Sequence, residues 1–339
     1  MIIIARIRLK DIAEKAGVSI TTVSRVLNNK RSNIPVSKST KDKVKNIAKE
    51  LNYQPNANAR ALVSKKTKII ALVLPEDIGS FFNRVIEGIE EYLKQDDYRL
   101  ILCTTGYEPP EKVIEELLRQ NIVDGVLIGS STRITNKDHF INIVKDNSFP
   151  TVFITNSWYD FPSVRVDSYR GAYQAAEHMI NKGRKKLAII TGPNLEEIVD
   201  SKERFNGFKD CLQDNKLDLK EEYIIYGEYN FKKGYNSAKK LLNLESPPDG
   251  IFISEDQMAM GAMRAALEMG VKIPQELSIV GFDNIDQAKY LNPSLTTVSQ
   301  PRIKMGKKAA EMLIKLIEDK KLEEKEVIFK ADLVIREST

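Results

Sequence analysis

Three side chains suited to reading the edges of DNA bases lie within one short run, at Ile20, Thr21 and Arg25. An arginine presents a forked pair of donors to the O6 and N7 atoms of guanine. A threonine hydroxyl hydrogen-bonds to several bases, and an isoleucine packs on the thymine methyl group. These residue types predict contacts in the major groove of a DNA duplex, provided that one element presents all three.

The hydroxyl and amide side chains around this run suit phosphate groups better than bases. They are Ser19, Thr22, Ser24 and Asn28. Side chains that bind phosphates fix the register of a protein on DNA but carry no information about base sequence. We therefore expect these residues to position the run and the first three to read the bases.

Short helices are predicted to position both sets. The first ends at Gly17, which tolerates a positive φ, and Ser19 is placed to cap the second. Apolar residues at helical spacing form their buried faces: Ile12, Ala13, Ala16, Val23, Val26 and Leu27. Two such helices form a helix-turn-helix, whose second helix lies in the major groove. A third helix is expected at residues 38–51, with its lysines toward solvent or phosphate.

Charge is divided unevenly along the chain. Residues 1–67 hold 15 lysines and arginines against 4 aspartates and glutamates, whereas the remainder holds 37 against 43. A basic head joined to a mildly acidic body indicates that the head binds a polyanion.

Residues 9–63 closely resemble the DNA-binding head of the LacI/GalR (lactose and galactose repressor) family of bacterial transcription regulators. The resemblance rests on the stretches AGVS, TVSRVLN, LNYQPN and A-x-AL. It implies an all-α helix-turn-helix DNA-binding domain at 1–54, a hinge helix and linker at 55–67, and an effector-binding and dimerisation domain at 68–339.

The hinge is the part of the head for which the resemblance adds most. A helix that follows Pro55, capped by Asn56, is too short to be stable alone in water. In the family this helix orders on the operator, pairs with its dimer mate and wedges a leucine into the minor groove. Leu62 occupies that position, with Ala59 beside it; a linker residue packed on the core is the alternative for Leu62. The DNA-contacting set is completed by Thr40 and Tyr53.

Past residue 67, short apolar runs alternate with amphipathic helical segments. Strands are expected at 69–74, 99–104, 125–129, 151–155, 186–191, 223–226, 250–254 and 278–282. Helices are expected at 82–93, 111–119, 171–181, 202–213, 232–242, 258–268 and 303–317. Continuous apolar strands separated by helices are typical of parallel sheet covered on both faces. Because one twisted sheet rarely holds so many strands, we expect two doubly wound α/β lobes.

The body is also similar to the periplasmic-binding-protein-like sensor domain of the same family. The similar stretches include GRKKLAIITGP, DQMAMGAMRAALEMG, PQELSIVGFDN and PSLTTVSQP. This resemblance implies a chain that crosses repeatedly between two parallel-sheet lobes. The first lobe is expected at 68–157 and 297–322, and the second at 158–296 and 323–339.

Polar and aromatic side chains follow the expected strands. Ligands of open α/β sheets bind beyond the carboxyl ends of the strands, and a cleft between two lobes is a common pocket. The effector-binding candidates are Asp77, Phe81, Thr155, Asp200, Arg204, Tyr229, Glu255 and Asp283. A carboxylate-rich cleft with aromatic rings suits a hydroxyl-rich neutral sugar with apolar ring faces.

The family resemblance assigns roles to three of these candidates. It implies that Arg204 binds ligand oxygens, that Asp283 accepts ligand hydroxyls and that Tyr229 stacks on a sugar or base. The structural alternatives are an ion pair of Arg204 with Glu196 or Glu197, a turn cap for Asp283 and a core position for Tyr229.

Two candidates depart from the usual family pattern. Glu255 stands where the family often has asparagine, and Thr155 where aspartate is common. Trp158 is expected either near the cleft or as a packing residue, and Asp167 as a helix cap rather than a ligand contact. These departures leave the identity of the effector open.

Enzymatic residue patterns are missing from the sequence. It has no glycine-rich phosphate loop and no Cys/His cluster with metal spacing, so no cofactor and no metal are expected. Its two histidines, His139 and His178, fit no catalytic triad. Cys103 and Cys211 are expected to be buried free thiols. Without a signal-peptide core or a spanning segment, a cytoplasmic protein with no membrane partner is expected.

Together these features predict a homodimeric, sequence-specific transcription regulator, and more specifically a repressor. Its partners are expected to be a near-palindromic double-stranded DNA operator and a small-molecule effector, a sugar or oligosaccharide. A purine- or phosphoprotein-responsive regulator of the same fold is the alternative. A carbohydrate-binding protein without a transcriptional role is the alternative from a different class. The operator, the effector and the sign of the response stay open.

Overall fold

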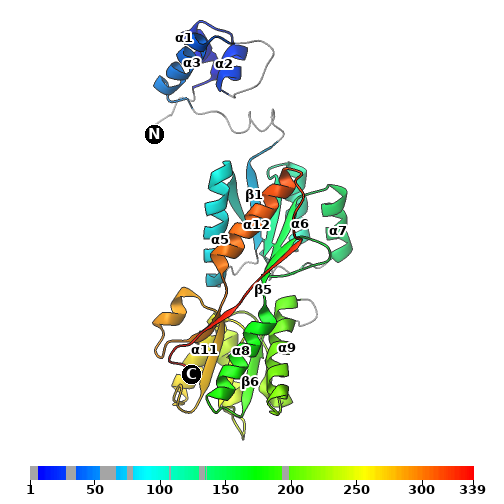
Figure 1. Ribbon diagram of the computed structural model, residues 1–339, viewed down its shortest axis with the longest axis vertical. Helices are drawn as coiled ribbons and strands as arrows, with labels where there is room; N and C mark the ends of the chain where they lie inside the picture. Colours follow the sequence, from blue (N-terminus) through cyan, green and yellow to red (C-terminus); the bar gives the residue numbers. More distant parts are fainter. Residues whose placement is uncertain are drawn as a thin grey trace. The chain divides into compact units, whose positions relative to one another are not determined.

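Two compact units make up the chain, at Met1–Thr67 and Lys68–Thr339. The computed structural model describes residues 7–27, 36–53, 66–74, 79–106, 108–129, 134, 136–192 and 198–339 (Figure 1). Over these ranges, no helix combines the length and the apolar character needed to cross a membrane.

The first unit is a bundle of short helices. They are α1 (Leu9–Ala16), α2 (Ile20–Leu27) and α3 (Lys38–Glu50). Gly17 ends α1 with a φ of 66°, a left-handed conformation that glycine adopts without steric cost. The apolar faces of the helices meet in one small core that includes Ile12, Val23 and Val44, each 0% exposed. The predicted helix-turn-helix is confirmed.

The first sheet of the body contains six strands in the order β11-β5-β4-β3-β1-β2, and all neighbours are parallel. Its strands are β1 (Ile69–Leu74), β2 (Arg99–Thr104), β3 (Gly125–Gly129), β4 (Thr151–Ile154), β5 (Ser163–Val166) and β11 (Glu326–Phe329). The central strands β3 and β4 are buried along their whole length, as their unbroken apolar sequences predict.

The second sheet has the strand order β12-β10-β9-β8-β6-β7. Its strands are β6 (Leu187–Thr191), β7 (Ile224–Tyr226), β8 (Gly250–Ile253), β9 (Ser278–Asp283), β10 (Thr296–Ser299) and β12 (Asp332–Val334). Neighbouring strands are parallel except that β12 runs antiparallel to β10 at the edge. The carboxyl ends of β6, β8 and β9 therefore lie along one edge of the sheet.

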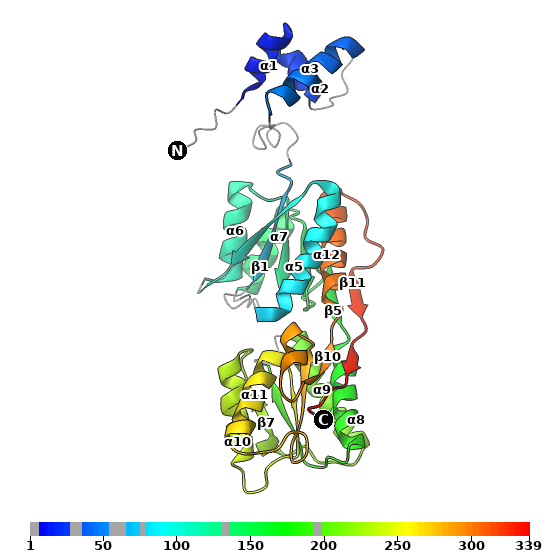
Figure 2. The same ribbon diagram turned by 90° about the vertical axis from the view of Figure 1, so that its left-hand side faces the viewer.

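Pairs of helices cover both faces of each sheet (Figures 1 and 2). In the first lobe, α5 packs with α12 on one face and α6 packs with α7 on the other; in the second, the pairs are α8 with α9 and α10 with α11. The helices are α5 (Gly79–Leu93), α6 (Pro110–Gln120), α7 (Lys137–Asp146), α8 (Ser168–Asn181), α9 (Val199–Asp214), α10 (Phe231–Leu242), α11 (Asp256–Glu268) and α12 (Arg302–Ile317). Short 3-10 helices are η1 (Lys94–Asp96), η2 (Glu221–Tyr223) and η3 (Asp286–Tyr290). The body is thus two doubly wound lobes.

The boundaries between the lobes differ from the expected ones. β5 and β11 belong to the first sheet, although both were expected in the second lobe. Conversely, β10 belongs to the second sheet, although part of it was expected in the first lobe. The physical reason is strand pairing at the edge of the first sheet, where β5 pairs with β4 and β11 pairs with β5. The chain therefore leaves the first lobe only after β5 and, later, only after β11.

Smaller elements and one thiol also differ from the predictions. Helix α7 was not predicted, because it is short and buries only Phe140 and Val144. Both cysteines are free, but only Cys211 is buried. Cys103 is half-buried because its strand, β2, lies at the edge of the first sheet.

Candidate functional sites

Helix α2 presents the three predicted base-reading side chains outside the core of the head. Val23 and Val26 are its buried residues. Ile20, at 48% exposed, and Thr21 project into solvent, and Arg25 is half-buried in the last turn. An exposed isoleucine is unfavourable in water, so a surface that buries it, such as a thymine methyl group, would stabilise the contact. The contacts with DNA stay a prediction.

The predicted phosphate-binding residues are partly used within the head. Ser19 Oγ accepts a hydrogen bond from the Thr22 backbone N–H at 3.1 Å, so the predicted helix cap is confirmed. The Ser19 and Thr22 hydroxyls also lie 2.9 Å apart. Ser24 is half-buried on the same helix.

On α3, the equivalent cap is Ser37, whose Oγ accepts from the Thr40 N–H at 3.2 Å. Tyr53 packs against the core of the head. Asn28, Asn56, Ala59 and Leu62 lie outside the described residues, so the hinge helix stays a prediction.

In the body, Arg204 is held rigidly in the second lobe. It is 5% exposed on α9, and its Nη1 donates to the Ser254 carbonyl at 2.6 Å. Its Nη2 lies 3.5 Å from Asp200 Oδ2, one helical turn earlier. The guanidinium also stacks on Phe282, 3.9 Å from the ring centroid. These contacts fix the plane of the guanidinium, whereas Glu196 and Glu197 lie outside the described residues.

Tyr229 interacts electrostatically with Arg204, and its hydroxyl group is hydrogen-bonded within the second lobe. Its hydroxyl is 2.5 Å from Ser201 Oγ on α9. A Cβ atom at Gly192 would collide with both hydroxyls, so glycine at the end of β6 makes room for this contact. Burial raises the pKa of Tyr229, while Arg204 opposes the rise. The ring of Tyr229 is partly buried against the core of the second lobe, in agreement with the alternative that Tyr229 is a core residue. A stacking role for this ring stays a prediction.

Asp283 ends β9 in an uncommon backbone conformation, with a φ of 115°. It is 4% exposed, and its Oδ1 accepts from Gln300 Nε2 at 2.6 Å. Strained backbone of this kind concentrates at functional sites. Burial raises the pKa of Asp283, and Arg204 opposes that rise.

Two acidic residues begin α11 next to Asp283. Glu255 caps the helix by accepting from the Met258 N–H at 3.0 Å. Asp256 accepts from Thr297 Oγ1 at 2.6 Å and from the Ile285 N–H at 2.9 Å. Burial, followed by repulsion from Asp283, raises the pKa of both carboxyl groups. Burial likewise raises the pKa of Asp200 to about 7.

Several buried polar atoms near the ends of the strands have no hydrogen-bond partner within the described part of the chain. They are Thr155 Oγ1, Thr191 Oγ1, Asp200 Oδ1, Arg204 Nε, Ser254 Oγ and Gln300 Oε1. A buried polar atom without a partner is destabilising, roughly by 1–3 kcal/mol. A bound ligand or ordered water would satisfy such atoms, so this set marks a candidate ligand site.

Phe81 and Thr155, two further predicted effector residues, belong to the first lobe. Phe81 packs edge-to-face on Phe82 and against the core of the first lobe. Thr155 follows β4 with a φ of 68°. Trp158 packs on Phe140 in the first lobe, which agrees with the packing alternative. Asp77 lies outside the described residues.

Asp167 caps α8, as predicted, by accepting from the Arg170 N–H at 2.9 Å. Other polar residues near this site were missed, namely Ser201, Ser254 and Gln300. Two of them, Ser254 and Gln300, directly follow β8 and β10, so a complete search of strand ends would have found them.

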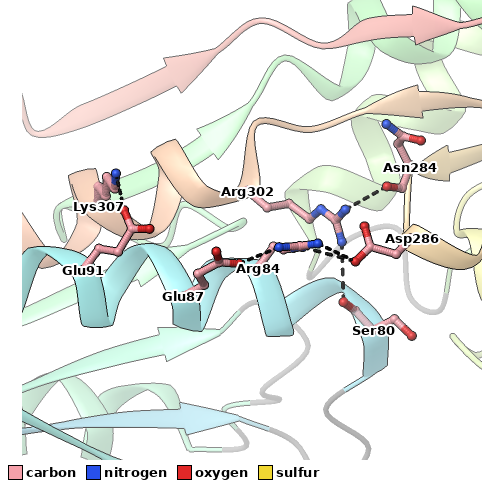
Figure 3. Close-up of polar contacts among 8 residues, drawn as sticks. All are labelled: Ser80, Arg84, Glu87, Glu91, Asn284, Asp286, Arg302 and Lys307. Atoms are coloured by element: carbon pink, nitrogen blue, oxygen red, sulfur yellow. Dashed lines mark hydrogen bonds and ion pairs between the residues drawn. The ribbon is translucent and has the colours of Figure 1, made fainter.

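Polar contacts join the two lobes next to Asp283 (Figure 3). Arg84 of α5 donates to Asp286 Oδ2 through Nη2 at 2.8 Å and through Nε at 3.2 Å. Arg302, at the start of α12, donates to the Asn284 carbonyl at 2.7 Å and to the Ser80 carbonyl at 3.5 Å. Residues 283–286 therefore connect a cleft carboxylate directly to the first lobe.

Known proteins match this chain over nearly its whole length. The family model "Bacterial regulatory proteins, lacI family" matches residues 8–56, and "Periplasmic binding protein-like domain" matches residues 176–339. The HTH-type transcriptional regulator RegA of Clostridium saccharobutylicum is 34% identical over 98% of each chain. The HTH-type transcriptional repressor PurR of Vibrio vulnificus is 33% identical over 97% of this chain and 98% of its own.

Solved structures agree with these relatives. A lac repressor dimer bound to operator and the anti-inducer ONPF is 25% identical, with a TM-score of 0.85 and 98% of each chain covered. A complex of the transcriptional regulator CelR with cellobiose is 27% identical, with a TM-score of 0.74, 98% of this chain and all of that chain covered. The relatives are named as regulators and repressors, not as enzymes. The chain belongs to the LacI family and is a DNA-binding transcriptional repressor with an effector-binding domain.

Proposed function

We propose that a sugar or oligosaccharide, bound in the cleft around Arg204, controls the affinity of this repressor for a near-palindromic operator. The observation that carries this proposal is the set of unpartnered buried polar atoms, which includes Asp200 Oδ1, Arg204 Nε and Ser254 Oγ. Sugar hydroxyls both donate and accept hydrogen bonds, so one sugar ring satisfies carboxylate, guanidinium and hydroxyl groups together. Tyr229 supplies an aromatic face for the apolar side of a sugar ring.

Sugar complexes of similar proteins support this effector class. Besides the CelR complex with cellobiose, a LacI-family regulator from Enterococcus faecium has been solved with bound ribose. That chain is 28% identical, with a TM-score of 0.71 over 80% of this chain. The same fold therefore accommodates both a disaccharide and a monosaccharide.

Effector binding would change the affinity for DNA by changing the arrangement of the two lobes. A ligand shifts a conformational equilibrium only by its differential affinity for the two states. Asp283 faces the cleft groups, and residues 284–286 contact the first lobe through Arg84 and Arg302. An effector that engages Asp283 therefore biases the lobe arrangement, which changes whether two heads can grip both operator half-sites.

A homodimer would present those two heads. A groove along α11 and the loops that follow it is lined mainly by apolar residues, among them Met260, Met263, Leu267, Val271 and Leu291. Exposed apolar surface of this kind marks an interaction site. The lac repressor relative was solved as a dimer, so a second copy of this chain is the proposed occupant. Leu267→Glu should convert the dimer to monomer in analytical ultracentrifugation, and a retained dimer would exclude this surface.

A thermal-shift screen of the whole chain against sugars and purines tests the effector proposal. A ligand at 100 times its dissociation constant adds about 2.7 kcal/mol of stability, which moves a melting transition by a few degrees. Stabilisation by a mono- or oligosaccharide supports the proposal. Stabilisation by purines alone, or by neither set, contradicts it.

A purine is the second candidate effector. It is favoured by the relatives named PurR, which are 33–36% identical over nearly the whole chain. Arg204 and Asp283 would then bind the polar edge of a purine, and Tyr229 would stack on its ring. The same screen separates the two candidates, because purines form its contrast set.

A further inference from the structure

The beginning of α9 carries side chains of the candidate ligand site and is also attached to the first lobe. Asp200 and Arg204 lie on this part of the helix, and each has a buried polar atom without a hydrogen-bond partner among the described residues. At the start of the helix, the Val199 N–H donates to Asn156 Oδ1 at 3.4 Å. Asn156 follows β4 of the first sheet and is 8% exposed. The helix that carries two candidate ligand groups therefore also contacts the other lobe.

A second contact between α9 and the first lobe is an ion triad centred on Arg165. Arg165 Nη1 donates to both carboxylate oxygens of Glu203, at 2.8 and 3.0 Å, and Arg165 Nε donates to Glu326 Oε1 at 2.7 Å. Glu203 directly precedes Arg204 on α9. Arg165 and Glu326 belong to β5 and β11, which are neighbours in the first sheet. The triad therefore joins the ligand-site helix to two strands of the first lobe.

The triad is located where the chain passes from one lobe to the other. After β5 the chain enters α8, and after β11 it enters β12, so both strands lead from the first sheet into the second lobe. The first sheet also contains β1, whose chain segment directly follows the head. Three hydrogen bonds fix the guanidinium of Arg165, so a shift of α9 relative to the first lobe would have to change them.

Burial distinguishes this triad from the contact between Arg84 and Asp286. The side chains of Arg165 and Glu203 are 12% and 26% exposed, compared with 42% and 52% for Arg84 and Asp286. Solvent and salt therefore screen the triad less. Replacement of a buried ion pair by apolar side chains is often neutral for stability, so the benefit of such a pair can lie in fixing one arrangement.

We propose that Arg165 is a positioning residue of the effector response, which transmits a change at Asp200 and Arg204 to the first lobe through Glu203. This inference rests on the proposed effector control and adds a second connection to the one formed by residues 284–286. Arg165 does not contact the effector, and the same connection serves a sugar or a purine, because both would bind Arg204. A triad with a structural role alone would change the stability of the body and leave the response intact.

Effector binding and effector response are measured separately on the full chain. Titration calorimetry gives the affinity for each of five probes, which are cellobiose, ribose, glucose, hypoxanthine and guanine. Fluorescence anisotropy gives the dissociation constant of an operator selected from random sequence, with and without each probe at saturation. The ratio of these two constants measures the coupling free energy between the effector site and the DNA-binding head.

Arg165→Met should separate the two measurements. A probe should bind within about threefold of its affinity for the wild type, because Arg204 keeps its contacts with Ser254, Asp200 and Phe282. The coupling free energy should fall by at least about half, because one of the two connections between the lobes is lost. Glu203→Met should cause the same fall. It leaves Arg165 paired with Glu326, so no buried charge loses its only partner and the variant is expected to fold.

Lys325→Met is the matched control. It removes the ion pair of Lys325 with Asp160, at 2.6 Å, which joins the segments before β11 and before β5 within the first lobe. Both measurements should keep their wild-type values in this variant.

Three outcomes overturn the role of Arg165. Wild-type coupling in Glu203→Met overturns it and leaves the effector control standing. A larger loss of probe affinity in both triad variants overturns it as well, because the triad would then act on the ligand site itself. If no probe changes operator binding by the wild type, the proposed function fails and the role of Arg165 fails with it. A response to purines alone contradicts only the sugar proposal, and the variants then test Arg165 with the purine.

Discussion

The recognition helix α2 and the effector cleft hold their ligand-binding side chains in opposite ways. Ile20 and Thr21 project into solvent from a single helix, supported only by the apolar stripe beneath them. Arg204 and Asp200 of α9 and Asp283 at the end of β9 are almost fully buried, so two elements far apart in the sequence contribute these groups. On the proposed roles, the head reads DNA with one exposed surface, whereas the body surrounds its effector with the interior of a lobe.

This difference determines what a substitution can change. An exposed side chain can be exchanged with little effect on folding, so operator specificity can be altered on α2 alone. A buried charge is stable only with its partners, and removal of one partner leaves the other uncompensated. Effector specificity is consequently tied to the stability of the second lobe.

Among the substitutions that test this comparison, Arg204→Ala should have the largest effect, which is on the response to the effector. The guanidinium bridges Ser254, Asp200 and the face of Phe282, so its loss removes a ligand group and leaves Asp200 without its cation. The sugar that stabilises the wild-type chain should no longer stabilise the variant in thermal-shift measurements, while operator binding is retained. Arg170→Ala, at an exposed position of α8, is the matched control. An unchanged response would remove Arg204 from the site.

Arg25→Ala tests the helix α2 side of the comparison, where Arg25 is half-buried. Loss of a bidentate contact with guanine should weaken operator binding by about 1–3 kcal/mol and relax the base preference at one position. Binding can be measured on an operator selected from random sequence and on unselected DNA. Lys49→Ala, an exposed change on α3, should weaken binding to both DNAs alike if that lysine contacts phosphate. An equal loss on both DNAs for Arg25→Ala would assign it to phosphate as well.

The pH dependence of stability tests how strongly the cleft carboxyl groups are buried. Burial raises the pKa of Asp200 from 3.8 to about 7, so the folded state holds this proton more tightly than the unfolded state. Its contribution to stability is therefore full below about pH 4 and is lost as the pH rises toward 7, by up to ~1.4 kcal/mol per pH unit. Asp200→Asn should flatten the pH dependence of urea unfolding between pH 4 and 7. An unchanged slope would show that Asp200 titrates normally.

Sequence reasoning succeeded where local chemistry determines local structure. The caps at Ser19 and Asp167, the glycine at the end of α1 and the unbroken apolar strands each follow from a few neighbouring residues. It failed for β5, β10, β11 and β12, whose short sequences SVRV, TTVS, EVIF and DLV become strands because neighbouring strands are available to pair with them. Tertiary context therefore set the lobe boundaries.

The sequence predicted which residues belong to the candidate site but not which side chains they contact. The rule that ligands bind beyond strand ends selected Arg204, Glu255 and Asp283, because each lies near such an end. That Arg204 stacks on Phe282 and that Gln300 donates to Asp283 depends on distant segments meeting in space. Spacing along the chain does not encode such contacts, so the geometry of the candidate site could not be predicted from the sequence.

Removal of the ion pair between Arg84 and Asp286 should have the smallest effect on stability. Both side chains are exposed, although the pair connects the two lobes. Both side chains are about half exposed, at 42% and 52%, and exposed pairs contribute below about 1 kcal/mol. Asp286→Asn should reduce the free energy of unfolding of the body by less than that in low salt and by nearly nothing in 1 M salt. Glu87→Gln removes the other partner of Arg84, within α5, and should behave alike in salt without altering a contact between lobes. A larger, salt-independent loss for Asp286→Asn alone would show that this exposed pair behaves like the buried cleft, since screening by salt distinguishes the two environments.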